Sequence, residues 1–60
     1  MATKSDYRVE SIQKITYNGK KCKMFKVYKL IGRDFIFMGN WTAPLKVKNE
    51  YLWQVYDLTS

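Results

Sequence analysis

The chain has 60 residues, of which 17% are aromatic, and its eleven basic and five acidic side chains give a net charge of +6. A single cysteine and the absence of histidine exclude an internal disulfide and a zinc site of the usual cysteine and histidine type. A chain this short forms one domain and buries only about 60% of its unfolded surface. Its stability must therefore come from dense aromatic packing or from oligomerisation.

The N-terminal segment resembles neither a secretory signal nor a membrane span. Residues 1–5 are polar and are predicted to be disordered, and residues 6–60 are predicted to form the single domain. No apolar run reaches the length of about 18 residues that a transmembrane helix needs, so no membrane partner is expected. Because a lone cysteine suits a reducing compartment, we expect an intracellular protein, either cytoplasmic or associated with chromatin or a nucleoid.

The first predicted strand covers residues 7–17, where apolar and polar side chains alternate loosely. Ile12 interrupts the alternation, which indicates a bulge or a strong twist between two half-strands. Asn18-Gly19 follows and predicts a type I′ turn, because both central residues of that turn need a positive φ. The first strand is therefore expected to form a hairpin with the next one.

The second predicted strand covers residues 20–31. Its apolar side chains change parity near Met24-Phe25, which predicts another bulge at that point. The sequence Gly32-Arg33-Asp34 then predicts a second tight turn. These two turns give a meander of three antiparallel strands.

The third predicted strand runs from Phe35 to Met38 and extends to Trp41 beyond a kink at Gly39, and Pro44 should end its regular pairing. Alternation predicts one apolar face made by Phe35, Phe37 and Trp41 and a second made by Ile36 and Met38. Because both faces are apolar, the strand is either buried on both faces or uses one of them to bind a partner.

The C-terminal segment, residues 50–58, fits two structures. As a helix it places Leu52, Val55 and Tyr56 on one side, and Asn49 could cap it. As a strand it has the tyrosine, tryptophan and valine content that sheets favour. We prefer the strand and keep the short helix as the alternative.

Two short stretches resemble chromodomains: YRVESI at residues 7–12 matches their opening pattern, and WTAP at residues 41–44 is similar to their later Trp-Glu-Pro motif. The resemblance covers residues 6–45 and implies a small bent sheet followed by a C-terminal helix. It also implies that Tyr7 is the first ring of a methyl-lysine cage, whereas Lys29-Leu30 and Arg33 stand where the remaining rings belong. The incomplete cage argues against methyl-lysine specificity.

The expected fold is mainly β, with three long strands and a C-terminal strand or short helix. The sheet is small, antiparallel and curled, and it forms a partial barrel of the SH3-like or chromodomain-like kind.

The sequence argues against catalysis, so neither a catalytic residue nor a cofactor or metal is expected. Histidine, the commonest acid–base catalyst, is missing, and the five acidic residues are scattered. Cys22 is more readily explained as a buried structural residue than as a nucleophile. Gly19, Gly32 and Gly39 lie in separate turns and form no phosphate-binding loop.

Basic side chains gather on the predicted hairpin and its turns, where they could follow a phosphate backbone and gain affinity by counterion release. The alternative is that these lysines only prevent edge-to-edge pairing of sheets. The candidate nucleic-acid-binding residues are Lys14, Lys20, Lys21, Lys23, Lys26 and Arg33.

Aromatic side chains supply the second candidate surface, because exposed rings beside lysines can stack on bases. A hydrophobic core should take most of the rings, and those left over would mark a binding groove or a self-association surface. The candidate aromatic contacts are Tyr28, Trp41, Trp53 and Tyr56.

We therefore expect a small, basic, non-enzymatic binding module that binds nucleic acid, DNA in the first place. The alternative is a protein-interaction module that acts through an exposed aromatic surface. It would form a homodimer or dock as an inhibitor or adaptor, for example on an acidic protein surface. A peptide reader of the chromodomain type is a third hypothesis.

Overall fold

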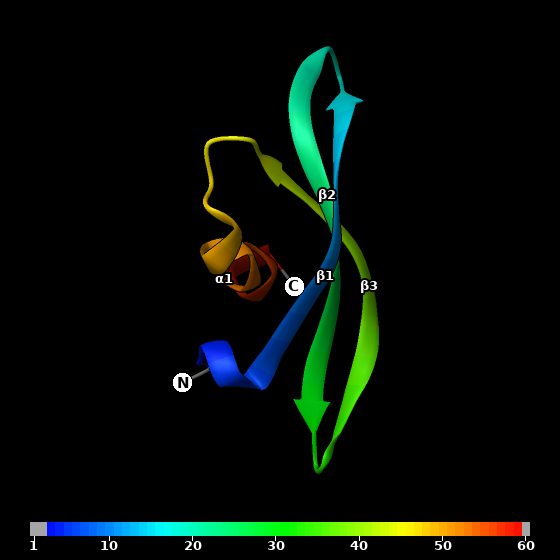
Figure 1. Cartoon of the computed structure of the whole chain (residues 1–60), viewed down its shortest axis with the longest axis vertical. Helices are drawn as coiled ribbons and strands as arrows, with labels where there is room; N and C mark the ends of the chain where they lie inside the picture. The colour runs from blue at the N-terminus through cyan, green and yellow to red at the C-terminus, as the bar shows by residue number, and fades with distance from the viewer. Residues whose placement is uncertain (1–2, 60) are drawn as a thin grey trace.

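The computed structural model describes residues 3–59 as an antiparallel sheet of three strands with a short helix across one of its faces (Figure 1). The strands are β1 (Tyr7–Tyr17), β2 (Lys20–Ile31) and β3 (Asp34–Pro44), in the spatial order β1-β2-β3. The 3₁₀ turn η1 (Lys4–Asp6) precedes them, and η2 (Asn49–Tyr51) leads into the helix α1 (Leu52–Thr59). The molecule is mainly β, as the sequence predicts.

Residues 1 and 2, part of the segment predicted to be disordered, lie outside the described residues. Within the remainder of that segment the Thr3 amide donates a hydrogen bond of 3.0 Å to the Asp6 side chain, which closes the η1 turn.

Both predicted turns are confirmed. Asn18 and Gly19 have φ values of 51° and 75°, the positive values that a type I′ turn requires, and they connect β1 to β2. Gly32 has a φ of 67° and lies in the turn between β2 and β3. The two turns lie at opposite ends of the long axis (Figure 1).

The predicted bulge in β1 is also confirmed. The register of β1 on β2 shifts between Glu10 and Gln13, and Ser11 inside this interval has a φ of 55°. The bulge expected at Met24-Phe25 in β2 is wrong, because these two residues pair continuously with β3. The change of parity in β2 arises because this central strand is apolar on both of its faces.

A second irregularity lies between β2 and β3 and changes which side chains share a face. The register shifts between Val27 and Tyr28, so that Met38 is the extra residue on β3. Phe37 pairs with Tyr28 on one side of this bulge, and Trp41 pairs with Phe25 on the other. Phe35 and Phe37 therefore lie on the face opposite Trp41, and the predicted shared face of these three rings is wrong.

The preferred strand at the C-terminus is wrong, and the helical alternative is correct. Residues Leu52–Thr59 form α1, and Leu52 and Tyr56, one turn apart, are both buried against the sheet. Val55 lies on the same side and is partly buried. The strand preference of tyrosine, tryptophan and valine is small, so the packing of one apolar helix side on the sheet decides the structure.

The core lies between α1 and the sheet. Its buried members are Tyr7, Phe25, Val27, Ala43, Leu52 and Tyr56. Trp41 meets Tyr56 edge to face with ring centroids 4.6 Å apart, and Trp53 stacks on Tyr7 at 5.7 Å. Within the described residues β1 and β3 each pair only with β2, so the sheet is open and does not close into a barrel.

Candidate nucleic-acid interface

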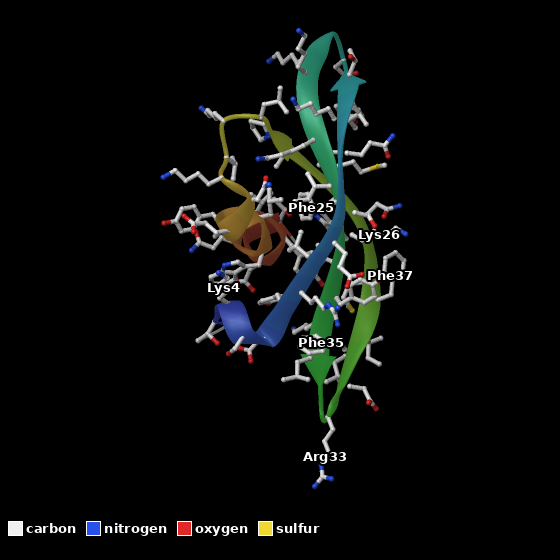
Figure 2. All side chains as sticks on the ribbon, viewed as in Figure 1. Lys4, Phe25, Lys26, Arg33, Phe35 and Phe37 are labelled. Atoms are coloured by element: carbon white, nitrogen blue, oxygen red, sulfur yellow. The ribbon has the colours of Figure 1, made fainter. Side chains whose placement is uncertain are left out.

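The sheet face opposite α1, named here the open face, is covered by no other element of the described chain (Figure 1). Figure 2 shows Lys26 and Phe37 pointing away from the helix and Phe25 pointing toward it. Because paired residues of antiparallel strands share a face, the pairing assigns the other members. The central part of the open face consists of Arg8, Glu10, Gln13, Met24, Lys26, Tyr28, Leu30, Phe35, Phe37, Asn40 and Thr42.

Aromatic rings form the middle of the open face. The rings of Tyr28 and Phe37 lie on neighbouring strands with centroids 5.4 Å apart and planes tilted by 56°. Phe37 is 51% exposed and Phe35 is 42% exposed, although both side chains are large and apolar. Such rings present accessible flat surfaces to a ligand.

Cationic side chains flank these rings. Arg8 is the cross-strand partner of Tyr28, and Lys26 lies between Glu10 and Asn40 on the two neighbouring strands. The Arg8 Nε atom donates to Glu10 Oε1 over 2.7 Å, and both side chains remain accessible to solvent. The central open face thus combines two cations and one carboxylate with exposed aromatic rings.

The other predicted basic contacts are spread along a molecule 39 Å long. Lys20 and Lys21 are exposed beside the Asn18-Gly19 turn, whereas Arg33 lies at the opposite end in the second turn (Figure 2). Lys14 is exposed too, and it pairs with Lys23 and so points to the helix side. Lys21 has the same parity on β2 as Lys23 and also points to the helix side, so these basic residues do not share one face of the sheet.

A shallow surface hollow lies close to the Asn18-Gly19 end of the sheet. It brings two of the predicted lysines together with a residue of the segment that follows β3. Its lining residues are Lys14, Ile15, Thr16, Lys21, Cys22 and Leu45.

Lys23 belongs to the interior. Only 6% of its surface is exposed, because it has the same parity on β2 as Phe25 and Val27. Its Nζ atom donates to the carbonyl oxygen of Val47 and, over 2.9 Å, to Asn49 Oδ1. Lys23 therefore fixes the segment before α1, and its ammonium group is not accessible to a phosphate.

Among the four predicted aromatic contacts, only Tyr28 lies on the open face. Tyr56 is buried, Trp53 stacks on Tyr7, and the Trp41 Nε1 atom donates to Thr59 Oγ1 over 2.9 Å. These three side chains hold the helix on the sheet.

The exposed rings that replace them are Phe35 and Phe37. The sequence places both on an apolar face of the third strand that is either buried or binds a partner, although they are not among the four predicted aromatic contacts.

Tyr7 cannot act as an open cage ring, because it is buried under α1. Its hydroxyl donates a hydrogen bond of 2.6 Å to Asp57 Oδ1. This bond, together with burial, raises the pKa of Tyr7 to about 12, since both disfavour the tyrosinate form. The geometry gives no support to a methyl-lysine site at this ring.

Residues 3–59 contain no group of three cysteine, aspartate or glutamate side chains placed to hold a metal ion. In the same part of the chain, no helix has the length and apolar character needed to cross a bilayer. The chain matched no protein-family model, no curated protein and no solved structure with which it was compared. The fold is an open three-stranded sheet with one helix across one face, and the opposite face carries exposed aromatic rings.

Proposed function

We propose that this chain is a non-enzymatic module that binds single-stranded nucleic acid on its open face. The observation that carries the proposal is the group of rings made by Tyr28, Phe35 and Phe37 on an uncovered sheet, with Arg8 and Lys26 beside Tyr28. Rings on a sheet surface stack on unpaired bases, and nearby cations contact the phosphates. Stacking requires accessible base faces, which favours a single strand over a duplex.

The free energy of base stacking is large enough for a small protein to bind a single strand. Base–aromatic stacking contributes about 1–3 kcal/mol per base. The long axis of 39 Å corresponds to about eleven stacked nucleotides at about 3.4 Å each. Lys20, which has the same parity on β2 as Lys26, lies beyond the rings at one end of the molecule, and Arg33 lies at the other end. No base-specific contact is required, so we expect little sequence preference.

A fluorescence anisotropy titration tests the proposal. The probes are a labelled oligothymidylate of about 12 nucleotides and a duplex of the same length, each measured at about 50 and 200 mM salt. We expect tighter binding to the single strand and an affinity that falls as the salt concentration rises. Failure to bind either probe at the lower salt concentration would refute the proposal, and equal binding to the duplex would refute the role of stacking.

Replacement of one ring separates stacking from charge. Phe37→Ala should weaken single-strand binding by about 5- to 150-fold, the equivalent of about 1–3 kcal/mol for one stacked base. The salt dependence should stay the same, because no cation is removed. Tyr51→Ala is the matched control, since Tyr51 is another exposed ring but belongs to η2 and lies away from the open face.

A protein-interaction module is the second candidate. The observation that favours it is an exposed apolar group at the Gly32 end of the β2–β3 hairpin. Its members are Ile31, Phe35, Ile36, Phe37 and Met38. A group of this size on a 60-residue chain is typical of a contact surface.

A further inference from the structure

The two edges of the sheet differ in their protection against pairing. β1, one edge, carries Arg8, Glu10 and Lys14, the kind of charged side chains that discourage edge-to-edge contact. β3, the other edge, has no charged side chain after its first residue, Asp34. Its segment from Asp34 to Met38 ends at the bulge beside Gly39, so this short stretch is an unprotected edge.

The same segment is apolar on both faces. Phe35 and Phe37 lie on the open face, whereas Ile36 pairs with Lys29 and lies on the helix side. The end of the hairpin extends past α1, so the helix does not cover Ile36, which is 45% exposed (Figure 1). A partner packed on one face of the sheet would cover either Phe35 and Phe37 or Ile36. A strand added at the edge of β3 would contact the side chains on both faces.

We propose that two copies of this chain pair antiparallel through β3, about a two-fold axis at Ile36. Phe35 of one copy then lies opposite Phe37 of the other, and the two Ile36 side chains face each other. Paired residues must share a face, and both phenylalanines lie on the open face. This register uses the whole segment from Asp34 to Met38, whereas a shift by two residues would run into the turn or the bulge.

Most of the lysines that give each copy its net charge of +6 lie away from this contact, and the cations nearest to it are Lys29 and Arg33. The lysines of the Asn18-Gly19 turn lie at the end of the long axis opposite the Gly32 turn, close to which the copies would meet (Figure 1). Charges farther apart than a Debye length, about 10 Å at 0.1 M salt, are largely screened. Repulsion between the two lysine-rich ends is therefore weak.

The pairing has a consequence for the open face. A two-fold axis perpendicular to the sheet places the open faces of both copies on the same side of a continuous six-stranded sheet. The rings of Phe35 and Phe37 from the two copies then form one uninterrupted surface. The dimer does not depend on nucleic-acid binding, and either can fail without the other.

Sedimentation equilibrium of the full chain tests the dimer. We expect a dimeric mass at micromolar to millimolar concentration and at least a tenfold weaker dimer for Ile36→Lys. The matched control is Ile12→Lys on the β1 edge, where the side chain is 42% exposed. It should leave the dimer intact, and circular dichroism should confirm that both variants fold. A monomer at millimolar concentration, or a dimer insensitive to Ile36→Lys, overturns the proposal.

Cross-linking tests the register without relying on a destabilising charge. In a Cys22→Ser background, Ile36→Cys should give a disulfide-linked dimer on mild oxidation, since residues on a two-fold axis face each other at about 4.5–5.5 Å between Cβ atoms. Ile12→Cys in the same background should cross-link much more slowly. Equal cross-linking rates for the two variants would overturn the proposed axis.

Discussion

The Tyr7 hydroxyl donates a hydrogen bond of 2.6 Å to Asp57 Oδ1, which connects the first residue of β1 to the final turns of α1. The ring of the same tyrosine stacks on Trp53 and meets the edge of Tyr56. One side chain thus joins two segments that lie 50 residues apart in the sequence. In a domain of this size, such a long-range contact is a large fraction of the total stability.

This bond predicts a fall in stability at alkaline pH. The pKa of Tyr7 is raised from 10.0 to about 12, so between these values the unfolded chain releases the phenolic proton while the folded chain retains it. The contribution of Tyr7 is therefore complete below pH 10 and is lost as the pH rises toward 12. Urea unfolding at a series of pH values should show a steeper decline for the original chain than for Tyr7→Phe. Parallel declines in both proteins would contradict the assignment.

The packing of α1 should depend on one of its two leucines and not on the other. Leu52 is fully buried at the start of α1, whereas Leu58 near its end is 85% exposed. Leu52→Ala should cost about 2–5 kcal/mol, which is enough to unfold a domain of marginal stability. Leu58→Ala should change the free energy of unfolding by less than about 0.5 kcal/mol. Thermal unfolding followed by circular dichroism measures both, and a similar loss in the two variants would contradict the position of the helix.

Two lysines of β2 should have separable roles. Lys23 is buried with its ammonium group bonded to Val47 and Asn49, and Lys26 is exposed on the open face. Lys23→Met should lower the free energy of unfolding by about 1–3 kcal/mol, because it removes charge-assisted hydrogen bonds to the segment before α1. Lys26→Met should leave stability unchanged and reduce the salt-dependence slope of single-strand binding by about 0.7. The reverse pattern would show that the face assignment of β2 is wrong.

The strand meander could be predicted because its signals are local. Asn18-Gly19 and Gly32 are residues that readily adopt the positive φ values of tight turns, whatever surrounds them. In β1 the alternation of apolar and polar side chains breaks at the residues that form the bulge. The helix could not be decided in the same way. Its sequence is compatible with a strand, and only the apolar sheet surface that it covers selects the helix.

The candidate site depends on the bulge at Met38, which the alternation of side chains along the sequence does not reveal. A single extra residue at Met38 moves Phe35 and Phe37 to the face opposite Trp41. The sequence shows too many apolar side chains for one face, but it does not show which of them the helix covers. For the same reason Lys23 could not be recognised as buried, since its charge predicts exposure and only its parity with Phe25 reveals its place.

Gly39 should therefore be the residue on which this arrangement of faces depends. Its φ of 121° is rarely adopted by any residue with a side chain, and an added Cβ atom would lie 3.4 Å from Trp41 Cζ3. Gly39→Ala should lower the free energy of unfolding by about 1–3 kcal/mol. At about 4–8 °C per kcal/mol, calorimetry should resolve the fall in melting temperature. Asn40→Ala is the control, because the exposed neighbour has no such constraint. If the two variants have the same melting temperature, β3 does not need the bulge. Phe35 and Phe37 then need not lie on the face opposite Trp41.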